Sequence, residues 1–457
     1  MHGREQYRKM YLSNHLSQMI RKLKQIIIVL VLLTLPFIVA AQQKEATKKV
    51  FIPKNVDKVP ENNNFEDNES VFSNKRRVES ANVVIFWSKE LGEDPMQNAD
   101  TAKRFDVKRS LAETERFYNY YINKLKVLKK GHSVSDRYKA LVFIYGGNEG
   151  TAYGWGKDSV AILWTPAVRV HRYPYGVLAH ELGHSFQFMA GCDRGTSFSG
   201  AINEMGSQYL LWQVYPNWLD FENFHLTAFL KQTNLAFLHP DNQYHSPFLL
   251  EYWSQKHGLA FYGKLLNNLN PDEDPVMAYK RITHIDQDEF NDEVFDASRK
   301  FITWDLDRVR EVASKYANQH QTMFKPAENG WYAISPKNCP QNYGYNGIRL
   351  KVPTQASVKL DFKGLIDAEG YEYLNPENAG WRYGFLAVKE NGERVYGQVY
   401  HEKQGSYTFK VPAQTAYLWL VVSGAPTVHV KLAKKLDLIS KWPYQIKLTG
   451  TDLYQRS

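Results

Sequence analysis

Cysteine is nearly absent from this chain. Only Cys192 and Cys339 occur among 457 residues, and neither has a second cysteine nearby. This scarcity excludes a small scaffold held together by disulfides and a zinc site built from cysteine thiolates. In an exported protein the two cysteines could form one disulfide between distant segments. They could equally stay two separate buried thiols, and the sequence favours neither.

A large excess of positive charge is missing from the body of the chain. The formal net charge is +9. Residues 1–41 contain six Lys or Arg and one Glu, so subtracting their surplus of five leaves +4 for the remainder. Because this charge is mild and no basic stripe is interleaved with aromatic residues, we expect no nucleic-acid partner.

No apolar run is long enough to cross a membrane. The longest, residues 26–41, has about 16 residues, whereas a transmembrane helix needs about 20. Basic residues precede it within positions 21–24, and Val39-Ala40-Ala41 forms a small-residue cleavage site. We predict that residues 1–41 are a signal peptide and that the mature protein is secreted, periplasmic or on the cell surface, with no stable membrane span. The alternative is a permanent anchor.

Apolar residues are plentiful enough for sizeable cores, at 43% of the chain. Residues 42–78 are instead rich in Lys, Asn, Glu and Asp, which predicts a flexible lead-in. Strand and helix patterns then alternate up to about residue 330, where short alternating runs separated by Gly, Asn and Pro begin. We therefore predict an α+β fold with two domains, a mixed domain over residues 79–330 and an all-β sandwich over residues 331–457.

Apolar periodicity gives the predicted elements of the first domain. The glycines of residues 150–156 match neither the phosphate-loop fingerprint nor the Rossmann fingerprint, so they predict no nucleotide site. The predicted strands are residues 81–87, 140–145 and 159–164, and the predicted helices include residues 101–130, 199–212 and much of 213–329.

The motif that carries chemistry is His180-Glu181-x-x-His184. Residues four apart on an α-helix lie about 40° from each other around the axis, so both imidazoles would face one metal ion. Glu181 would project beside them, placed to take a proton from a water on that metal. Apolar residues at three- and four-residue spacing support a helix here, with Pro174 before its start and Gly191 at its end.

Glu204 lies 20 positions after His184, in a segment that also has an apolar stripe of helical spacing. That distance leaves room for a turn and an antiparallel return. The carboxylate could then complete a three-ligand Zn²⁺ site with an open fourth position for water. The alternative is an exposed helical glutamate. Because Glu204 lies beside the apolar stripe and not opposite it, we favour the ligand.

The spacing of these residues resembles the gluzincin motif of thermolysin-like zinc metallopeptidases: His180-Glu181-x-x-His184, nineteen residues, then Glu204. Residues 200–204, Gly-Ala-Ile-Asn-Glu, are similar to the glutamate-bearing helix of that family. The wider sequence looks like a family of exported bacterial zincin-like proteins with no well-established substrate. The resemblance implies a zincin-like catalytic domain, a Zn²⁺ cofactor and a protein substrate.

Ala161-x-x-Trp164 resembles the edge strand of the thermolysin-like family. The resemblance implies that Ala161 and Trp164 bind substrate, because an extended peptide could add to such an edge through main-chain hydrogen bonds. The alternative is an ordinary core strand.

One position departs from the thermolysin-like pattern. Those enzymes usually have an Asp four residues after the glutamate ligand, which holds the first histidine, and this chain has Gln208 there. An amide can accept a hydrogen bond from the imidazole but raises its basicity less than a carboxylate. We therefore expect Gln208 to support metal binding more than peptidase activity.

A gluzincin also needs a donor that stabilises the oxyanion formed during hydrolysis. Tyr244 and His245, in the polar loop 239–245, are our candidates, and the alternative is that they only pack the loop.

The predicted function is zinc-dependent hydrolysis of amide bonds in proteins or glycoproteins. The alternative is a binding protein on a zincin scaffold with weak or no activity. The sandwich could bind glycans through exposed aromatic residues such as Trp381 or Tyr383, or it could be a structural cap on the catalytic domain.

Overall fold

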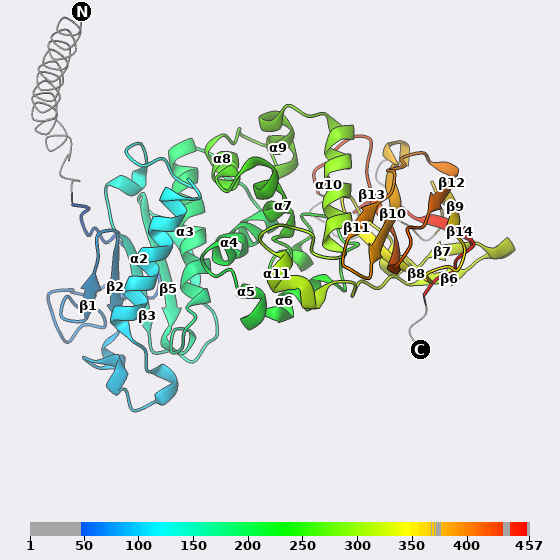
Figure 1. Cartoon of the computed structure of the whole chain (residues 1–457). Helices are drawn as coiled ribbons and strands as arrows, with labels where there is room; N and C mark the ends of the chain where they lie inside the picture. The colour runs from blue at the N-terminus through cyan, green and yellow to red at the C-terminus, as the bar shows by residue number, and fades with distance from the viewer. Residues whose placement is uncertain (1–46, 367, 370, 372–375, 433–438, 455–457) are drawn as a thin grey trace, which may run out of the picture. The chain divides into compact units, whose positions relative to one another are not determined.

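The computed structural model describes residues 47–366, 368–369, 371, 376–432 and 439–454. The predicted signal peptide lies outside these residues. Lys49–Ser457 form one compact unit. Its elements confirm the predicted α+β fold followed by a β-rich part (Figure 1). Within the described residues, no helix combines the length and the apolar character that a membrane span requires.

The first part is built on a five-stranded sheet with the order β1-β2-β3-β5-β4. The three central strands are parallel, and the two outer strands run antiparallel to their neighbours. Fully buried apolar runs form the centre of this sheet, as parallel strands covered on both faces require. The strands are β1 (Arg77–Glu79), β2 (Val83–Trp87), β3 (Ala140–Tyr145), β4 (Tyr153–Lys157) and β5 (Val160–Pro166).

The prediction that β5 is the sheet edge is wrong. Hydrogen bonds pair β5 with β3 on one side and with β4 on the other, so the main chain of Ala161 and Trp164 is already paired and cannot take up a peptide. Both side chains are buried. The edge strand is β4, most of which lies within the Gly-rich residues 150–156. The glycines hide the alternating pattern that would indicate a strand.

The prediction of a flexible lead-in is also wrong for its described residues, 47–78. Val56 and Phe72 are buried against one face of the sheet, where they pack with Phe86 and Phe143. Arg76 is buried as well and donates hydrogen bonds to three carbonyls of the same segment. A few well-spaced apolar side chains therefore anchor a segment whose average composition is polar.

The other face of the sheet is covered by α2 (Val107–Asn123) and α3 (Gly176–Arg194). Helix α2 is shorter than the predicted residues 101–130, and its N-cap Asp106 accepts from the Arg109 N–H. Helix α3 passes through Gly191, the predicted stop, and ends at Gly195, whose φ of 72° is the left-handed conformation that glycine adopts easily.

The remaining helices follow α3 in sequence. Helix α4 packs directly against α3, and the later helices lie between these two helices and the β-rich part (Figure 1). They are α4 (Ala201–Val214), α5 (Trp218–Phe221), α6 (Asn223–Phe229), α7 (Phe248–His257), α8 (Phe261–Asn267), α9 (Pro275–Thr283), α10 (Gln287–Phe301) and α11 (Arg310–Ala313).

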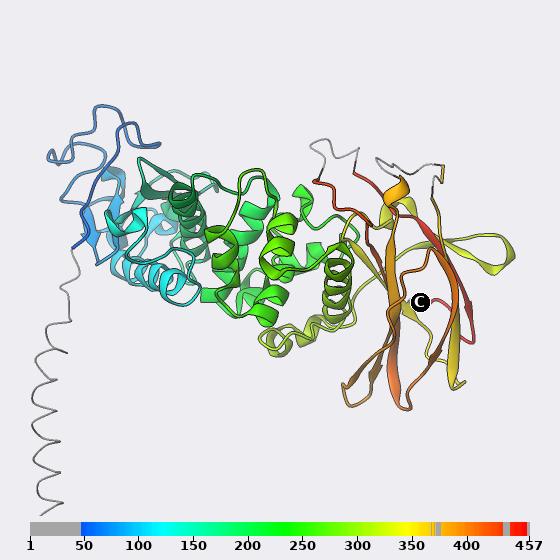
Figure 2. The ribbon, with the colours of Figure 1, turned by 90° about the horizontal axis from the view of Figure 1, so that it is seen from above.

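The β-rich part is a sandwich of two antiparallel sheets, with orders β11-β10-β13-β8 and β12-β9-β14-β7-β6 (yellow to red in Figure 2). Their inner faces share one hydrophobic core, where the rings of Phe362 and Tyr383 stack at 3.8 Å. The strands are β6 (Phe324–Pro326), β7 (Tyr332–Ile334), β8 (Tyr345–Leu350), β9 (Ser357–Gly364), β10 (Trp381–Lys389), β11 (Arg394–Tyr396), β12 (Gln404–Lys410), β13 (Thr415–Gly424) and β14 (Tyr444–Thr449).

The predicted glycan contacts at Trp381 and Tyr383 are wrong, because both side chains are completely buried between the two sheets. Each directs its polar atom to a backbone carbonyl inside the protein, Trp381 to that of Trp442 and Tyr383 to that of Glu402. The two cysteines do not form a disulfide. Cys192 is exposed on α3 and Cys339 is buried in the sandwich core.

Candidate metal centre

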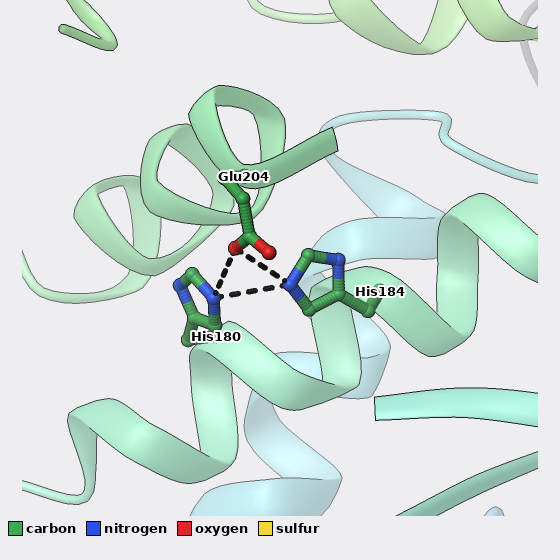
Figure 3. A group of neighbouring side chains, drawn as sticks. All are labelled: His180, His184 and Glu204. Carbon is green, nitrogen blue, oxygen red and sulfur yellow. Dashed lines mark hydrogen bonds and ion pairs between the residues drawn. The ribbon is translucent and has the colours of Figure 1, made fainter. Parts of the chain in front are cut away.

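Helices α3 and α4 bring the predicted ligands together (Figure 3). The Nε2 atoms of His180 and His184 lie 3.1 Å apart. Oε2 of Glu204 lies 3.1 Å from the first of these nitrogens and 3.0 Å from the second. The predicted antiparallel return after His184 therefore exists, and it places three donor atoms around one point.

The other ring nitrogen of each histidine contacts a glutamine oxygen. Nδ1 of His180 lies 2.8 Å from Oε1 of Gln208, and Nδ1 of His184 lies 3.1 Å from Oε1 of Gln187. The amide orientations are fixed from the far side, because Nε2 of Gln187 donates to the Asn203 carbonyl and Nε2 of Gln208 donates to the Tyr244 carbonyl. Both Nδ1 atoms therefore carry the proton, and both Nε2 atoms present lone pairs.

Three lone-pair atoms converging within 3.1 Å repel one another unless a proton or a metal cation lies between them. Zinc bonds of about 2.0–2.1 Å in tetrahedral geometry put neighbouring donors about 3.4 Å apart, close to the observed separations. Two imidazoles and one carboxylate are also the ligand set of catalytic zinc sites with an open fourth position. The residues present therefore fit Zn²⁺.

The pKa values of His180 and Glu204 are shifted by the close approach of the imidazoles to the carboxylate. Burial favours the neutral form of His180, but the nearby Glu204 carboxylate raises the pKa of the ring above its usual value. Burial likewise opposes ionisation of Glu204, yet the two imidazoles hold its pKa well below the usual range. Both shifts mean that the site favours positive charge, carried by a proton or by a bound cation, between the rings and the carboxylate.

Glu181 lies in a cavity of about 600 Å³ that also contains the three ligands. Its side chain is 8% exposed, and its carboxylate accepts no hydrogen bond from the residues that the structure describes. Burial raises the pKa of this carboxyl above its usual value. The Glu181 carboxylate in this cavity is therefore not one of the candidate ligands and forms no ion pair with the described residues.

The edge strand β4 forms one wall of this cavity. Its Gly154 lies directly on α3, so that a Cβ atom at this position would be 1.8 Å from the Glu181 carbonyl oxygen. Only glycine permits this approach of strand and helix. The edge strand β4 thus lies beside the candidate metal centre, whereas the sequence pattern predicted the edge one strand away, at β5.

Of the two predicted oxyanion donors, the structure places one in the cavity. Tyr244 is part of the cavity wall, and its ring centroid lies 6.1 Å from that of His180. Burial, and after it the negative charge of Glu204, raises the pKa of Tyr244 to about 12. His245 is not among the residues that form the cavity wall. Its Nδ1 lies 2.8 Å from Nδ1 of a different histidine, His225.

His225, on α6, is a cavity residue that sequence reasoning missed. Its Nε2 lies 3.1 Å from the Nε2 amide group of Gln208, which donates to it. Burial, and then the nearby His245 and His180, lowers the pKa of His225 to about 3, so the ring is neutral at physiological pH. No spacing in the sequence pointed to it, because its place depends on how α6 packs beside α4.

The chain belongs to the family of unknown function DUF6055, which it matches over residues 42–455. No curated protein matches it. A functionally unknown conserved protein mutant from Bacillus anthracis str. Ames is similar at 12% identity, covering 76% of this chain and 74% of that chain with a TM-score of 0.30. The Yersinia pseudotuberculosis-derived mitogen is 9% identical, covering 30% of this chain and 93% of that chain with a TM-score of 0.19.

Proposed function

We propose that this member of the DUF6055 family is an exported zinc-dependent hydrolase that cleaves amide bonds, acting as a peptidase on proteins or glycoproteins. One observation carries the proposal. Two imidazole Nε2 atoms and a carboxylate oxygen converge within 3.1 Å, while both Nδ1–H groups are held by glutamine oxygens. This donor set resembles that of gluzincins, and an uncommitted buried carboxylate lies in the same cavity.

Zinc, when bound by His180, His184 and Glu204, would polarise the scissile carbonyl and acidify a water molecule. Glu181 is the group in the cavity that can take the proton from that water. Its carboxylate accepts no hydrogen bond from the described residues, and its raised pKa makes it a better base than an exposed glutamate. Glu181 would then give the proton to the leaving amine.

Tyr244 can assist the attack step. With a pKa of about 12 its hydroxyl stays protonated at neutral pH, so it can donate a hydrogen bond to an oxyanion formed in the cavity. The free edge of β4, in the same wall, offers unpaired main-chain groups to an extended substrate.

Gln208 favours a second candidate, a zinc-containing binding protein on the same scaffold. The amide polarises the imidazole of His180 less than the usual carboxylate would, which weakens the case for turnover but not for metal binding. This candidate predicts bound zinc together with the absence of hydrolysis.

The experiment that separates the two candidates uses the purified mature protein. We expect about one zinc per chain and chelator-sensitive cleavage of a peptide library, read by mass spectrometry. Glu181→Gln should keep the zinc and lose at least about 100-fold in cleavage rate, because the general base is removed. The matched control, Glu149→Gln, changes an exposed carboxylate that pairs with Lys58 and should cleave normally. Full activity of the Glu181 variant would sink the mechanism, and zinc without any cleavage would favour the binding protein.

A further inference from the structure

A second cavity, of about 360 Å³, lies beside the four-stranded sheet of the sandwich. Its walls come from the linker residues 318–324, from Ile348 and Arg349 at the end of β8, and from Leu453 and Tyr454 near the C-terminus. Its size falls within the range of small-molecule sites, about 300–1,000 Å³. None of its residues belongs to the metal centre.

Arg349 gives this cavity an uncompensated positive charge. Among the residues that the structure describes, no carboxylate lies within ion-pair distance of its guanidinium, and its side chain donates no hydrogen bond. Instead, the guanidinium carbon lies 3.8 Å from the ring centroid of Tyr454 and 4.8 Å from that of Tyr417. Contacts with ring faces hold the guanidinium in place but satisfy few of its five N–H donors. These donors remain available to an anionic ligand.

The groups around Arg349 are neutral and polar. Gln321 is exposed, and its amide makes no hydrogen bond to the described residues. The Thr322 hydroxyl donates to the Gly347 carbonyl and keeps its lone pairs for another partner. Tyr454 is 42% exposed. The buried Nδ1 atom of His320 has no hydrogen-bond partner among the described residues. The cavity thus combines one cation, several neutral hydrogen-bonding groups and a half-exposed aromatic ring.

We propose that this cavity binds an acidic saccharide, a sugar unit that carries a carboxylate. The planar guanidinium of Arg349 matches a carboxylate through two parallel hydrogen bonds. The Tyr454 ring offers an apolar face to the sugar, and Gln321 and Thr322 can bond its hydroxyl groups. A single cation among neutral groups suits one carboxylate better than a phosphate or a peptide with several acidic residues.

The test uses the full mature chain, because the linker contributes to the cavity. Binding of N-acetylneuraminic acid and glucuronic acid is measured by calorimetry or by ligand-observed NMR and compared with neutral glucose and an acidic hexapeptide. We expect an acidic sugar to bind and glucose to bind at least about tenfold more weakly. Arg349→Gln should lower the affinity for the acidic sugar by about tenfold or more, since it removes a charge-assisted bidentate contact.

Lys351→Gln is the matched control. It removes the same charge two residues further along the chain, where Lys351 pairs with Asp452 outside the cavity, and it should bind the sugar like the parent protein. Arg349→Lys keeps the charge without the planar fork and should also bind more weakly at an unchanged Tm. Equal binding of acidic and neutral sugars, or an unaffected Arg349→Gln variant, would overturn the proposal. A hexapeptide that binds more tightly than both acidic sugars would refute the saccharide class. The readout does not involve the metal centre, so failure here leaves the proposed hydrolysis untouched.

Discussion

At the scale of single residues, Gln208 does more than replace the expected aspartate. Its oxygen accepts from Nδ1 of His180, and its Nε2 group donates both to the Tyr244 carbonyl and to Nε2 of His225. A carboxylate at this position could not donate either hydrogen bond. The amide therefore connects His180 to the loop that carries Tyr244 and to α6, which the sequence pattern alone did not reveal.

Removing either glutamine should weaken zinc binding. Gln187→Ala and Gln208→Ala each leave an imidazole without the partner that fixes its ring orientation and proton, which typically costs about 10–100-fold in metal affinity. Chelator competition with a zinc-sensitive dye measures the change. Gln243→Ala is the control, because this glutamine lies beside Tyr244 outside the cavity wall. Zinc affinity unchanged in both cavity variants would contradict the assigned proton positions.

The cluster of candidate ligands could be predicted from sequence, whereas the residues that contact it could not. His180, His184 and Glu204 follow the spacing of a helix and a return helix, which local periodicity reveals. Gln187 lies three residues after His184 on the same helix, but its amide is oriented by the Asn203 carbonyl of α4. His225 reaches the cavity only through the packing of α6 near Gln208, which no local rule encodes. Tyr244 was predicted from its residue type and its polar loop, a weaker signal that also pointed to His245.

At the scale of elements, the contact between β4 and α3 shapes the cavity. Gly154 and Gly156 face α3, and a Cβ atom at either position would overlap with the Glu181 backbone or with the Phe188 ring. The two glycines that hid β4 from sequence analysis are therefore the residues that let the strand lie on the helix.

Gly154→Ala should push β4 away from the metal centre. The new methyl group would meet the backbone of Glu181, which cannot rotate away as a side chain can. We expect a loss of about 1–3 kcal/mol in the free energy of unfolding and a large fall in any peptide cleavage. Thermal unfolding and the library digest measure the two effects. Gly150→Ala, with no atom near its added methyl group, is the control and should change neither. Parent-like stability of Gly154→Ala would argue against this close contact.

Elements with strong apolar periodicity were predictable and elements defined by tertiary contact were not. The buried runs of β2, β3 and β5 were predicted, and the alternating pattern after residue 330 predicted that this part is built of strands, although not where every strand lies. The segment 47–78 was mistaken for a lead-in because a few residues such as Phe72 are buried within a polar composition. The aromatic residues of β10 were placed outside because alternation gives two faces without saying which one is buried.

At the scale of the whole molecule, one hydrophobic core extends across the predicted boundary at residue 330. The largest cluster of buried residues contains side chains from the helices and also from the sandwich. The sandwich residues in this core are Tyr343, Tyr345, Leu386, Val388, Trp419 and Val421. We therefore expect the two parts to unfold together, and cutting the chain at residue 330 should expose apolar surface.

A buried polar contact links the two parts at α9. Asp274, the N-cap of α9, lies 2.7 Å from Nε2 of His429, a residue that follows the last strand of the four-stranded sheet. The other ring nitrogen of His429 lies 2.8 Å from the Tyr343 hydroxyl. Burial by itself would raise the pKa of Asp274, but the contact with His429 outweighs it and the pKa lies below its usual value.

This lowered pKa gives Asp274 a pH-dependent contribution to stability. The folded-state pKa is below the unfolded value of about 3.9, so the contribution is complete above that pH and is lost as the pH falls through the folded pKa. Asp274→Asn keeps the N-cap, since Asn caps about as well as Asp, but removes the charge. We expect a loss of about 1–3 kcal/mol at pH 7. The difference in the free energy of unfolding between this variant and the parent protein should become smaller below pH about 4.

Urea unfolding at pH 7, 5 and 3.5 measures this gap. Asp286→Asn changes the N-cap of α10, whose carboxylate bonds only backbone N–H groups of its own helix, and it should alter stability little at any of these pH values. A gap for Asp274→Asn that stays constant from pH 7 to 3.5 would mean that the charge contributes nothing and that the contact is held by shape alone. A gap that closes in acid would identify the Asp274–His429 contact as an electrostatic link between the helices and the sandwich.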